Sequence, residues 1–415
     1  MLIHALELGQ VLPEPVYVSN GRKLFSAGHV VTEQTLRVLK IWGVHSVAQG
    51  GAAITPQDTS AAIIDPSVFH DGSFSTLKSL CVNNDIDAEP IQTIIATCIE
   101  LARRPDRTCD YFFAYLSSSL EEDMAEDQQQ AVEDTELGRV VDENEVLPNL
   151  FYRAVNLLND VYVTPDTVVS IVKEDSFLKN KALDISRVLI QLPDNQVTTI
   201  HDCISLLGIR TVLYIIVVLV YMYYVKENRC TKASMHYYRK AMSTAVAARV
   251  IAKTTGVLGR DCFFANGAFL NTGTWWFYNK FFYMYAMVRK EALFGGNVAE
   301  IERKILGMDH ATFGAMMVKK YGLPYSLERT IAQHTGQFAE NQNKEVAVLL
   351  LAEAIGKALT YNPAYDVPMQ HLEQEVWDVL RISEDVLSDL VESIYNQSVQ
   401  IVQLTHGESP FVFRG

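Results

Sequence analysis

The reactive side chains of this sequence do not form a recognised catalytic motif. The six cysteines are scattered without a C-x-x-C pair, which is typical of buried or free thiols in a reducing compartment and favours the cytoplasm. Gly295-Gly296-Asn297 lacks the G-x-G-x-x-G spacing and follows no predicted strand, so it gives no support for a phosphate-binding loop. No serine or cysteine lies in a nucleophile motif, although a triad whose members meet only in space stays open.

Aromatic side chains are concentrated in residues 275–278 and 281–285, which read WWFY and FFYMY. Such a stretch could stack on nucleic-acid bases, as in proteins that bind single strands. Few arginines or lysines accompany it, so a helical core or a surface for a protein partner is the favoured interpretation. A homodimer through these helices is compatible with the spacing, which does not demand one.

The composition indicates a folded, acidic, multidomain chain. Its 415 residues suggest two or three domains, and 49% apolar residues are sufficient to build their cores. The 35 basic residues against 49 acidic ones give a net charge of −14, which argues against binding of nucleic acid through its phosphate backbone. No basic face that would reverse this conclusion is evident.

Most of the negative charge lies in one segment, Glu121 to Glu145. It contains eleven acidic residues and a single basic one, Arg139. A solvated linker or polar helix is the simple interpretation, and an acidic tether for a basic partner stays open.

The first fifty residues predict a small β-β-α-β domain. Asn20-Gly21 between two short apolar runs is a hairpin signal, and Thr32 can cap a helix that ends near Gly43, before a strand at Val44 to Val47. The N-terminus lacks the pattern of a signal peptide. The most apolar segment, Thr211 to Val225, is shorter than the roughly 20 residues of a spanning helix, so we expect a buried helix and no membrane span.

Helical spacing dominates the rest of the chain. Between Phe74 and Leu120, one apolar face is formed by Ile91, Ile94, Ile95, Cys98 and Ile99, which suits a helical neck or a docking surface. From Leu147 onward we predict helices at 151–158, 165–172, 177–189, 200–207, 210–225, 234–254, 301–304 and 310–321.

An ordered series of short motifs begins at Val146-Leu147-Pro148. It continues with AVNLLND at 154–160, TIHDCISLLG at 199–208, GAFLNTG at 267–273 and LGMDHATFGA at 306–315, and it ends with Gln333-His334. Read in this order, residues Leu147 to Leu359 resemble the HDOD family, the HD-related output domain. The resemblance implies an all-helical bacterial signalling module related to metal-dependent HD phosphohydrolases.

The N-terminal segment carries a second resemblance. Residues 9–12 (GQVL), 21–24 (GRKL) and Gly28 are similar to the small domain that precedes some HD-type cyclic-dinucleotide phosphodiesterases. The predicted fold is therefore mainly α, with an all-helical HDOD-like C-terminal domain and a small α/β N-terminal domain. The predicted parts are the small domain at 1–50, a linker and helical connector at 51–120, an acidic linker at 121–146, the HDOD-like domain at 147–360 and a helical extension at 361–415.

The resemblance also places the metal ligands of an HD phosphohydrolase on this sequence. The first histidine of that set falls on Lys240, whose ammonium has no lone pair for a metal. The His-Asp pair falls on Leu270-Asn271, and the final carboxylate falls on Glu353. Two of the usual ligands are thus lost outright and one is reduced to an amide, so we expect no metal and no cofactor, although weak Mg²⁺ binding stays open.

Histidines 310 and 334 correspond to histidines that recur in HDOD-like sequences. They could belong to a remnant polar pocket, or each could be a histidine with an ordinary structural hydrogen bond. Asp309 is expected to be an exposed or capping residue. One hypothesis combines the substitutions: the ammonium of Lys240 replaces the metal, pairs with Glu353 and is hydrogen-bonded by Asn271.

The sequence therefore predicts a non-catalytic bacterial regulatory protein in signal transduction. Its degenerate HD-like domain would bind a protein partner or a small ligand, a nucleotide among them. The alternative is an active metal-dependent phosphohydrolase, such as a cyclic-dinucleotide phosphodiesterase, that uses His310, His334, Glu353 and Asn271. In a third reading the pocket binds a cyclic dinucleotide without cleaving it, against which the scarcity of arginine argues.

Overall fold

The computed structural model describes residues 9–13, 15–17, 23–32, 35, 73–104, 112–113, 147–192, 196–229, 232–257, 259–336, 338 and 343–405. The chain divides into two compact units, Met1–Ala62 and Ile63–Gly415, and each is described by itself. The acidic segment at 121–145 lies outside the described residues.

The first unit contains an antiparallel pair of short strands where the sequence predicts the hairpin. Strand β1 (Val16–Tyr17) pairs with β2 (Lys23–Phe25), and Val16 lies opposite Phe25. An isolated bridge joins Val11 to Val30. The Asn20-Gly21 turn, most of the predicted helix and the strand at Val44 to Val47 lie outside the described residues, so the β-β-α-β domain stays a prediction.

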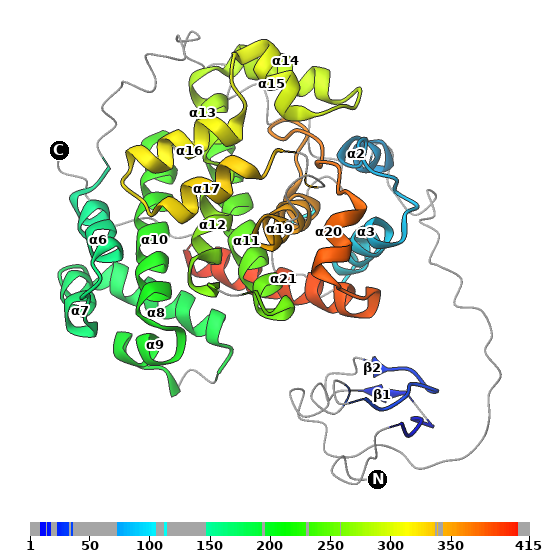
Figure 1. The fold of residues 1–415 in the computed structure, drawn as a ribbon, viewed down its shortest axis with the longest axis horizontal. Coiled ribbons are helices and arrows are strands. Elements are labelled where there is room, and N and C mark those ends of the chain that lie inside the picture. Colours follow the sequence, from blue (N-terminus) through cyan, green and yellow to red (C-terminus); the bar gives the residue numbers. More distant parts are fainter. Residues whose placement is uncertain are drawn as a thin grey trace. The chain divides into compact units, whose positions relative to one another are not determined.

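Every regular element described in the second unit is a helix, and the order of these helices follows Figure 1. The first part comprises α2 (Ser73–Leu80), α3 (Glu89–Ala102), α6 (Asn149–Asn159), α7 (Pro165–Lys173), α8 (Ser176–Ile190), α9 (Ile200–Leu207), α10 (Ile209–Arg229) and α11 (Lys232–Thr255). After the 3₁₀ turn η5 (Arg260–Cys262) come α12 (Phe263–Phe269), α13 (Thr272–Lys280), α14 (Phe282–Ala292), α15 (Val298–Leu306), α16 (His310–Lys320), α17 (Tyr325–Gln333), α19 (Lys344–Thr360), α20 (Gln374–Leu380) and α21 (Glu384–Thr405). The predicted all-helical fold class is confirmed, and each helix predicted from Leu147 onward is present.

Polar caps fix where many of these helices begin. Thr164 and Thr199 form capping boxes at the starts of α7 and α9, and Asp175 accepts from two backbone N–H groups of α8. Asn297 and Asn343 cap α15 and α19 in the same way. Each cap satisfies backbone donors that a helix start otherwise leaves without a partner.

Helix α10 is surrounded by other helices of the second unit. All its side chains from Val212 to Val225 are buried, and it contacts α6, α8, α9, α11 and α12. The predicted buried helix at Thr211 to Val225 is therefore confirmed. No single helix in the described part of the chain is long and apolar enough to cross a bilayer, and the pair α9–α10 that reaches this length together is bent by 119°.

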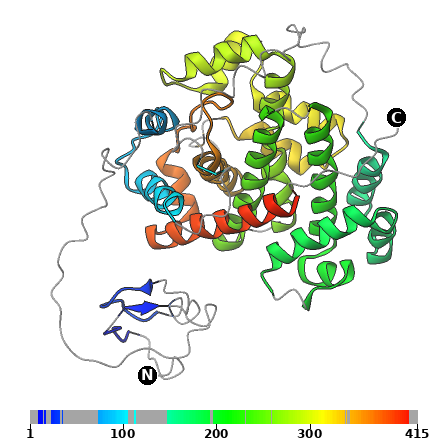
Figure 2. The ribbon, with the colours of Figure 1, turned by 180° about the vertical axis from the view of Figure 1, so that it is seen from behind.

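Helix α11 is the central element of the second unit, with α12, α19 and α21 packed around it. Figures 1 and 2, which view the unit from opposite sides, both show α11 between α12 and α19. The close approach depends on glycine, because a β-carbon at Gly267 or Gly356 would collide with Thr244 on α11. The packing holds Lys240 of α11 and Glu353 of α19 inside the molecule.

The aromatic stretch forms α13 and α14. Trp275, Trp276, Phe277 and Tyr285 are buried, and Phe277 packs against Phe313 of α16 with ring centroids 5.3 Å apart. These rings belong to the helical core, which leaves their faces inaccessible to bases. Met287 on α14, in contrast, is 60% exposed.

The helices before and after the HDOD-like segment pack onto the same unit. The apolar face of α3 predicted from Ile91 to Ile99 is buried, and α3 contacts α19 and α21. The backbone N–H of Met369 donates to the carbonyl of Leu80 at 2.8 Å, which joins the chain after α19 to the end of α2. The proposed domain boundaries remain predictions, but the connector and extension helices contribute to one packed body.

Candidate functional site

His310 is held at the start of α16. Asp309 caps this helix by accepting from the N–H of Thr312 at 2.8 Å, and its other oxygen lies 2.6 Å from Arg303 Nη1. Burial opposes ionisation of Asp309, but these partners lower its pKa overall. Asp309 is thus a capping residue that is buried and ion-paired, and it leads His310 into the interior.

Glu302 of α15 orients the ring of His310. Its Oε2 accepts from His310 Nδ1 at 2.6 Å and from the backbone N–H of His310 at 2.8 Å. Glu302 was not among the residues predicted from sequence. The available signal was its place on the apolar face of α15, at helical spacing from Val298 and Leu306, where a carboxylate needs a buried partner.

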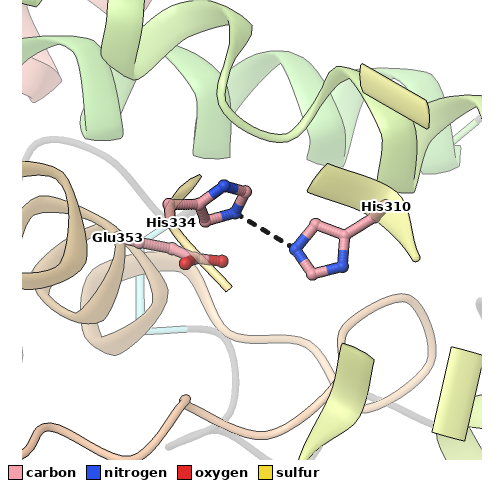
Figure 3. Close-up of side chains that lie close together, drawn as sticks. All are labelled: His310, His334 and Glu353. Carbon is pink, nitrogen blue, oxygen red and sulfur yellow. Dashed lines mark hydrogen bonds between the residues drawn. The ribbon is translucent and has the colours of Figure 1, made fainter. Parts of the chain in front are cut away.

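His334 lies at the C-terminal end of α17, facing His310. Its Nδ1–H donates to the carbonyl of Ile331 at 2.6 Å, and its Nε2 lies 3.2 Å from Nε2 of His310 (Figure 3). Burial and the neighbouring imidazole lower the pKa of His334 to about 4. Burial also disfavours the charged form of His310, but Glu302 outweighs it and raises the pKa of His310.

Glu353 of α19 completes this cluster. The ligand atoms of His310, His334 and Glu353 all lie within 4.8 Å of one another, and the three side chains are buried. Lys357, one turn further along α19, lies 3.1 Å from Oε1 of Glu353. Burial opposes ionisation of Glu353, but Lys357 and the two histidines lower its pKa to about 2.

Lys240 pairs with a different carboxylate from the one predicted. Its Nζ lies 2.6 Å from Oδ1 of Asp366, and Nε2 of His236 lies 2.7 Å from Oδ2 of the same residue. The backbone N–H of Asn362 donates to Oδ2 at 3.0 Å. Burial opposes ionisation of Asp366, but His236 and Lys240 lower its pKa strongly.

The hypothesis of a Lys240–Glu353 ion pair is therefore wrong. Glu353 already has a lysine one turn away on its own helix, and the segment after α19 returns to bring Asp366 to α11. The predicted contribution of Asn271 is wrong as well. Its side chain is buried, but the hydrogen bond described for the ammonium of Lys240 is donated to Asp366 and not to Asn271.

The ligand set of an HD phosphohydrolase does not fit the residues at its positions. Lys240 is committed to Asp366, Leu270 is apolar and fully buried, and Asn271 offers only an amide. The structure thus divides the five predicted residues. His310, His334 and Glu353 lie together, whereas Lys240 pairs with Asp366.

A small cavity lies beside the loop that carries His334. Its volume is about 300 Å³, and its wall is mainly apolar in surface, although most of the side chains that line it are of polar residues: Asn83, Asn297, Gln370, His371 and Glu373. Gln370 donates to the backbone carbonyl of His334 at 3.3 Å, which links the cavity wall to the histidine cluster. This volume is at the lower end of the range for small-molecule sites.

Comparisons with known proteins agree with this fold. Residues 145–337 match the family model of the HDOD domain. A protein from Shewanella amazonensis SB2B, provisionally named a phosphohydrolase, superposes with a TM-score of 0.52 at 17% identity, over 66% of this chain and 99% of its own. An HDOD domain protein with unknown function from Geobacter sulfurreducens superposes with a TM-score of 0.50 at 19% identity, over 64% of this chain and 95% of its own. A search of curated proteins finds no match.

The chain therefore carries an HDOD domain at residues 145–337, with the all-helical, HD-like fold of that domain. At these identities the solved structures support the fold alone. The resemblance proposed for the N-terminal segment has no counterpart among these findings and stays a prediction.

Proposed function

We propose that this protein is a non-catalytic regulator in signal transduction, whose HDOD domain binds a protein partner or a small ligand. The observation that carries the proposal is the buried pair between Lys240 and Asp366. It occupies the position where the resemblance places the first metal-binding histidine of an HD phosphohydrolase. A lysine ammonium donates hydrogen bonds and cannot ligate a cation.

The neighbouring positions support the same proposal. Hydrolysis of a phosphodiester by this fold would need several histidines and carboxylates around the metals that polarise the phosphoryl group and activate water. Leu270 and Asn271 replace the paired histidine and aspartate, and Lys240 already neutralises the nearby Asp366. Lys240 is thus part of an ion network with His236 and Asp366, and this network joins α11 to the segment after α19.

Two surfaces are suited to binding. The 300 Å³ cavity beside Gln370 has a mainly apolar wall that also carries amide and charged side chains, which fits a small ligand with both apolar and polar groups. Helix α14 and its end expose Tyr283, Met287 and Phe294, the last at 85%, and such a group of apolar side chains is typical of contacts with a protein partner. A second copy of the chain is one candidate for that partner.

A hydrolysis assay tests the proposal. The full-length protein, incubated with bis(p-nitrophenyl) phosphate and Mn²⁺, should release no more nitrophenol than buffer with Mn²⁺ alone. His310→Ala should behave in the same way, as should His201→Gln, a matched change of an exposed histidine on α9. Metal-dependent turnover that His310→Ala abolishes and His201→Gln retains would show that the protein is a phosphohydrolase.

The second candidate function is that phosphohydrolase, and one observation favours it. His310, His334 and Glu353 converge as a ligand set. A cyclic dinucleotide is the substrate class that the resemblance implies, so calorimetric titration with cyclic diguanylate separates the cases. Binding with cleavage supports the enzyme, whereas binding without cleavage identifies the ligand of a regulator.

A further inference from the structure

We infer that His310, His334 and Glu353 bind one divalent transition-metal ion, with Zn²⁺ as the ion that this ligand set suits best. Two imidazoles and one carboxylate are a known ligand combination for zinc with a fourth position left open. Of the positions where the resemblance places HD metal ligands, this site uses only Glu353 of α19, and it includes neither Lys240 of α11 nor Leu270-Asn271 between α12 and α13.

The distance between the two imidazoles matches that of ligands on one ion. Their Nε2 atoms lie 3.2 Å apart. Two nitrogens bound to zinc at about 2.0–2.1 Å with a tetrahedral angle are separated by about 3.3 Å. The rings therefore need little movement to bind a shared ion, and Figure 3 shows the carboxylate of Glu353 beside them.

The hydrogen bonds of the two rings direct the correct atoms toward that ion. His310 Nδ1 is committed to the carboxylate of Glu302, and His334 Nδ1 donates to the carbonyl of Ile331. When both rings are neutral, each Nε2 carries its lone pair toward the other, which is unfavourable unless a proton on His310 or a metal ion lies between them. A metal-binding histidine almost always donates its other N–H to a carboxylate or carbonyl, as both do here.

The charges around the cluster suit a single ion. Lys357 contacts Oε1 of Glu353, which leaves Oε2 for the metal. Glu302 and Glu353 supply two negative charges and Lys357 one positive charge, so one divalent ion leaves the fourth ligand position suited to an anionic group or water. Lys240, Leu270 and Asn271 offer no ligand set for a second ion beside it.

Metal titration of the full-length protein tests the inference. Protein stripped with a chelator should regain one Zn²⁺ per chain, measured by elemental analysis after dialysis. His334→Gln and Glu353→Gln should each weaken the affinity more than 100-fold, whereas His201→Gln should retain it. Co²⁺ in place of Zn²⁺ should give the intense visible absorption of tetrahedral coordination.

Glu302→Gln separates a metal site from an ordinary histidine pair. Glu302 is a positioning residue, so this change should weaken the affinity about 10- to 100-fold and shift the Co²⁺ spectrum without removing it. A measurement on the unaltered protein covers the case in which a variant fails to fold. Proton NMR of the Co²⁺ form should show two strongly shifted imidazole N–H resonances, from Nδ1 of His310 and of His334.

Each result has a defined meaning for both proposals. Absence of bound metal, or equal binding by His334→Gln and the unaltered protein, overturns the metal site and leaves the non-catalytic function in place. Bound metal without turnover of bis(p-nitrophenyl) phosphate supports both. Bound metal with turnover overturns the non-catalytic function and leaves the metal site intact.

Discussion

Asp366 joins two buried basic side chains of α11 to the segment after α19. It is buried and accepts from His236, Lys240 and the backbone of Asn362. Sequence reasoning identified Lys240 as an unusual buried cation but assigned it the wrong carboxylate. His236, one turn before Lys240 on α11, was a readable signal. Asp366 was not, because only the tertiary path of the segment after α19 brings it to α11.

Removal of this carboxylate should destabilise the fold. Asp366→Asn leaves the ammonium of Lys240 buried without its counter-ion, which should lower the free energy of unfolding by about 3–5 kcal/mol at pH 7. Urea denaturation followed by circular dichroism measures the change, with the exposed Asp378→Asn as the matched control. An unchanged midpoint would show that Asp366 contributes little to holding α11.

The same residue predicts a dependence on pH. The pKa of Asp366 is lowered in the folded protein, so its contribution is present above the unfolded value of about 4 and declines as the pH falls below it. The difference in stability between the unaltered protein and Asp366→Asn should therefore persist from pH 7 to about 5. It should shrink only in more acidic solution, and a difference that disappears by pH 6 would contradict this assignment.

At the scale of elements, glycines set how closely the helices around the histidine cluster approach. A β-carbon at Gly273, near the start of α13, would collide with the backbone carbonyl of His310, and Gly314 of α16 packs against Gly273 in turn. Sequence analysis recognised the two segments as motifs of the HDOD pattern. The structure explains their glycines, because α13 and α16 contact each other through their backbones and leave no room for a β-carbon.

Gly273→Ala should therefore affect both stability and His310. The forced separation of α13 and α16 should cost about 1–3 kcal/mol of unfolding free energy and displace the ring of His310 from Glu302. Thermal unfolding measures the first effect, and the chemical shift of the His310 ring the second. Gly336→Ala, which meets only an ordinary contact at 3.6 Å, should change the stability by less than about 0.5 kcal/mol.

Helix prediction from sequence was most exact where one face of a helix is polar. The segments at 165–172 and 200–207 have both apolar spacing and a threonine cap, and their bounds are those of α7 and α9 within one residue. For α12 to α14, in contrast, the sequence analysis predicted no helix bounds. Residues such as Phe263, Phe277 and Tyr285 are buried on several sides, so the contrast between faces that marks a surface helix is weak there.

At the scale of the whole molecule, the packed helical body includes helices that lie outside the HDOD domain. The family match ends at residue 337, yet α19 and α21 beyond it cover α11, and α3 before it packs on both. Division of a chain into domains by its composition cannot detect this, because an amphipathic helix in a connector has the same pattern as one in a core.

A truncated chain of residues 63–415 should fold like the intact protein. The division of the structure into Met1–Ala62 and Ile63–Gly415 implies that the larger unit has its own core. Its thermal midpoint, followed by circular dichroism at 222 nm, should lie within about 2 °C of the intact chain's helical transition. A large loss of stability would show that residues 1–62 are part of the same folding unit.

The burial of α10 has a consequence for synthesis of the chain. This helix has almost no polar face, and the hydroxyl of Tyr223 donates to the carbonyl of Thr405, 182 residues later in the sequence. At elongation rates of about 5–20 residues per second, roughly 9–36 s pass between the synthesis of Tyr223 and that of Thr405. During that interval a strongly apolar segment has emerged while its last neighbours are untranslated. We expect molecular chaperones to bind the nascent chain there.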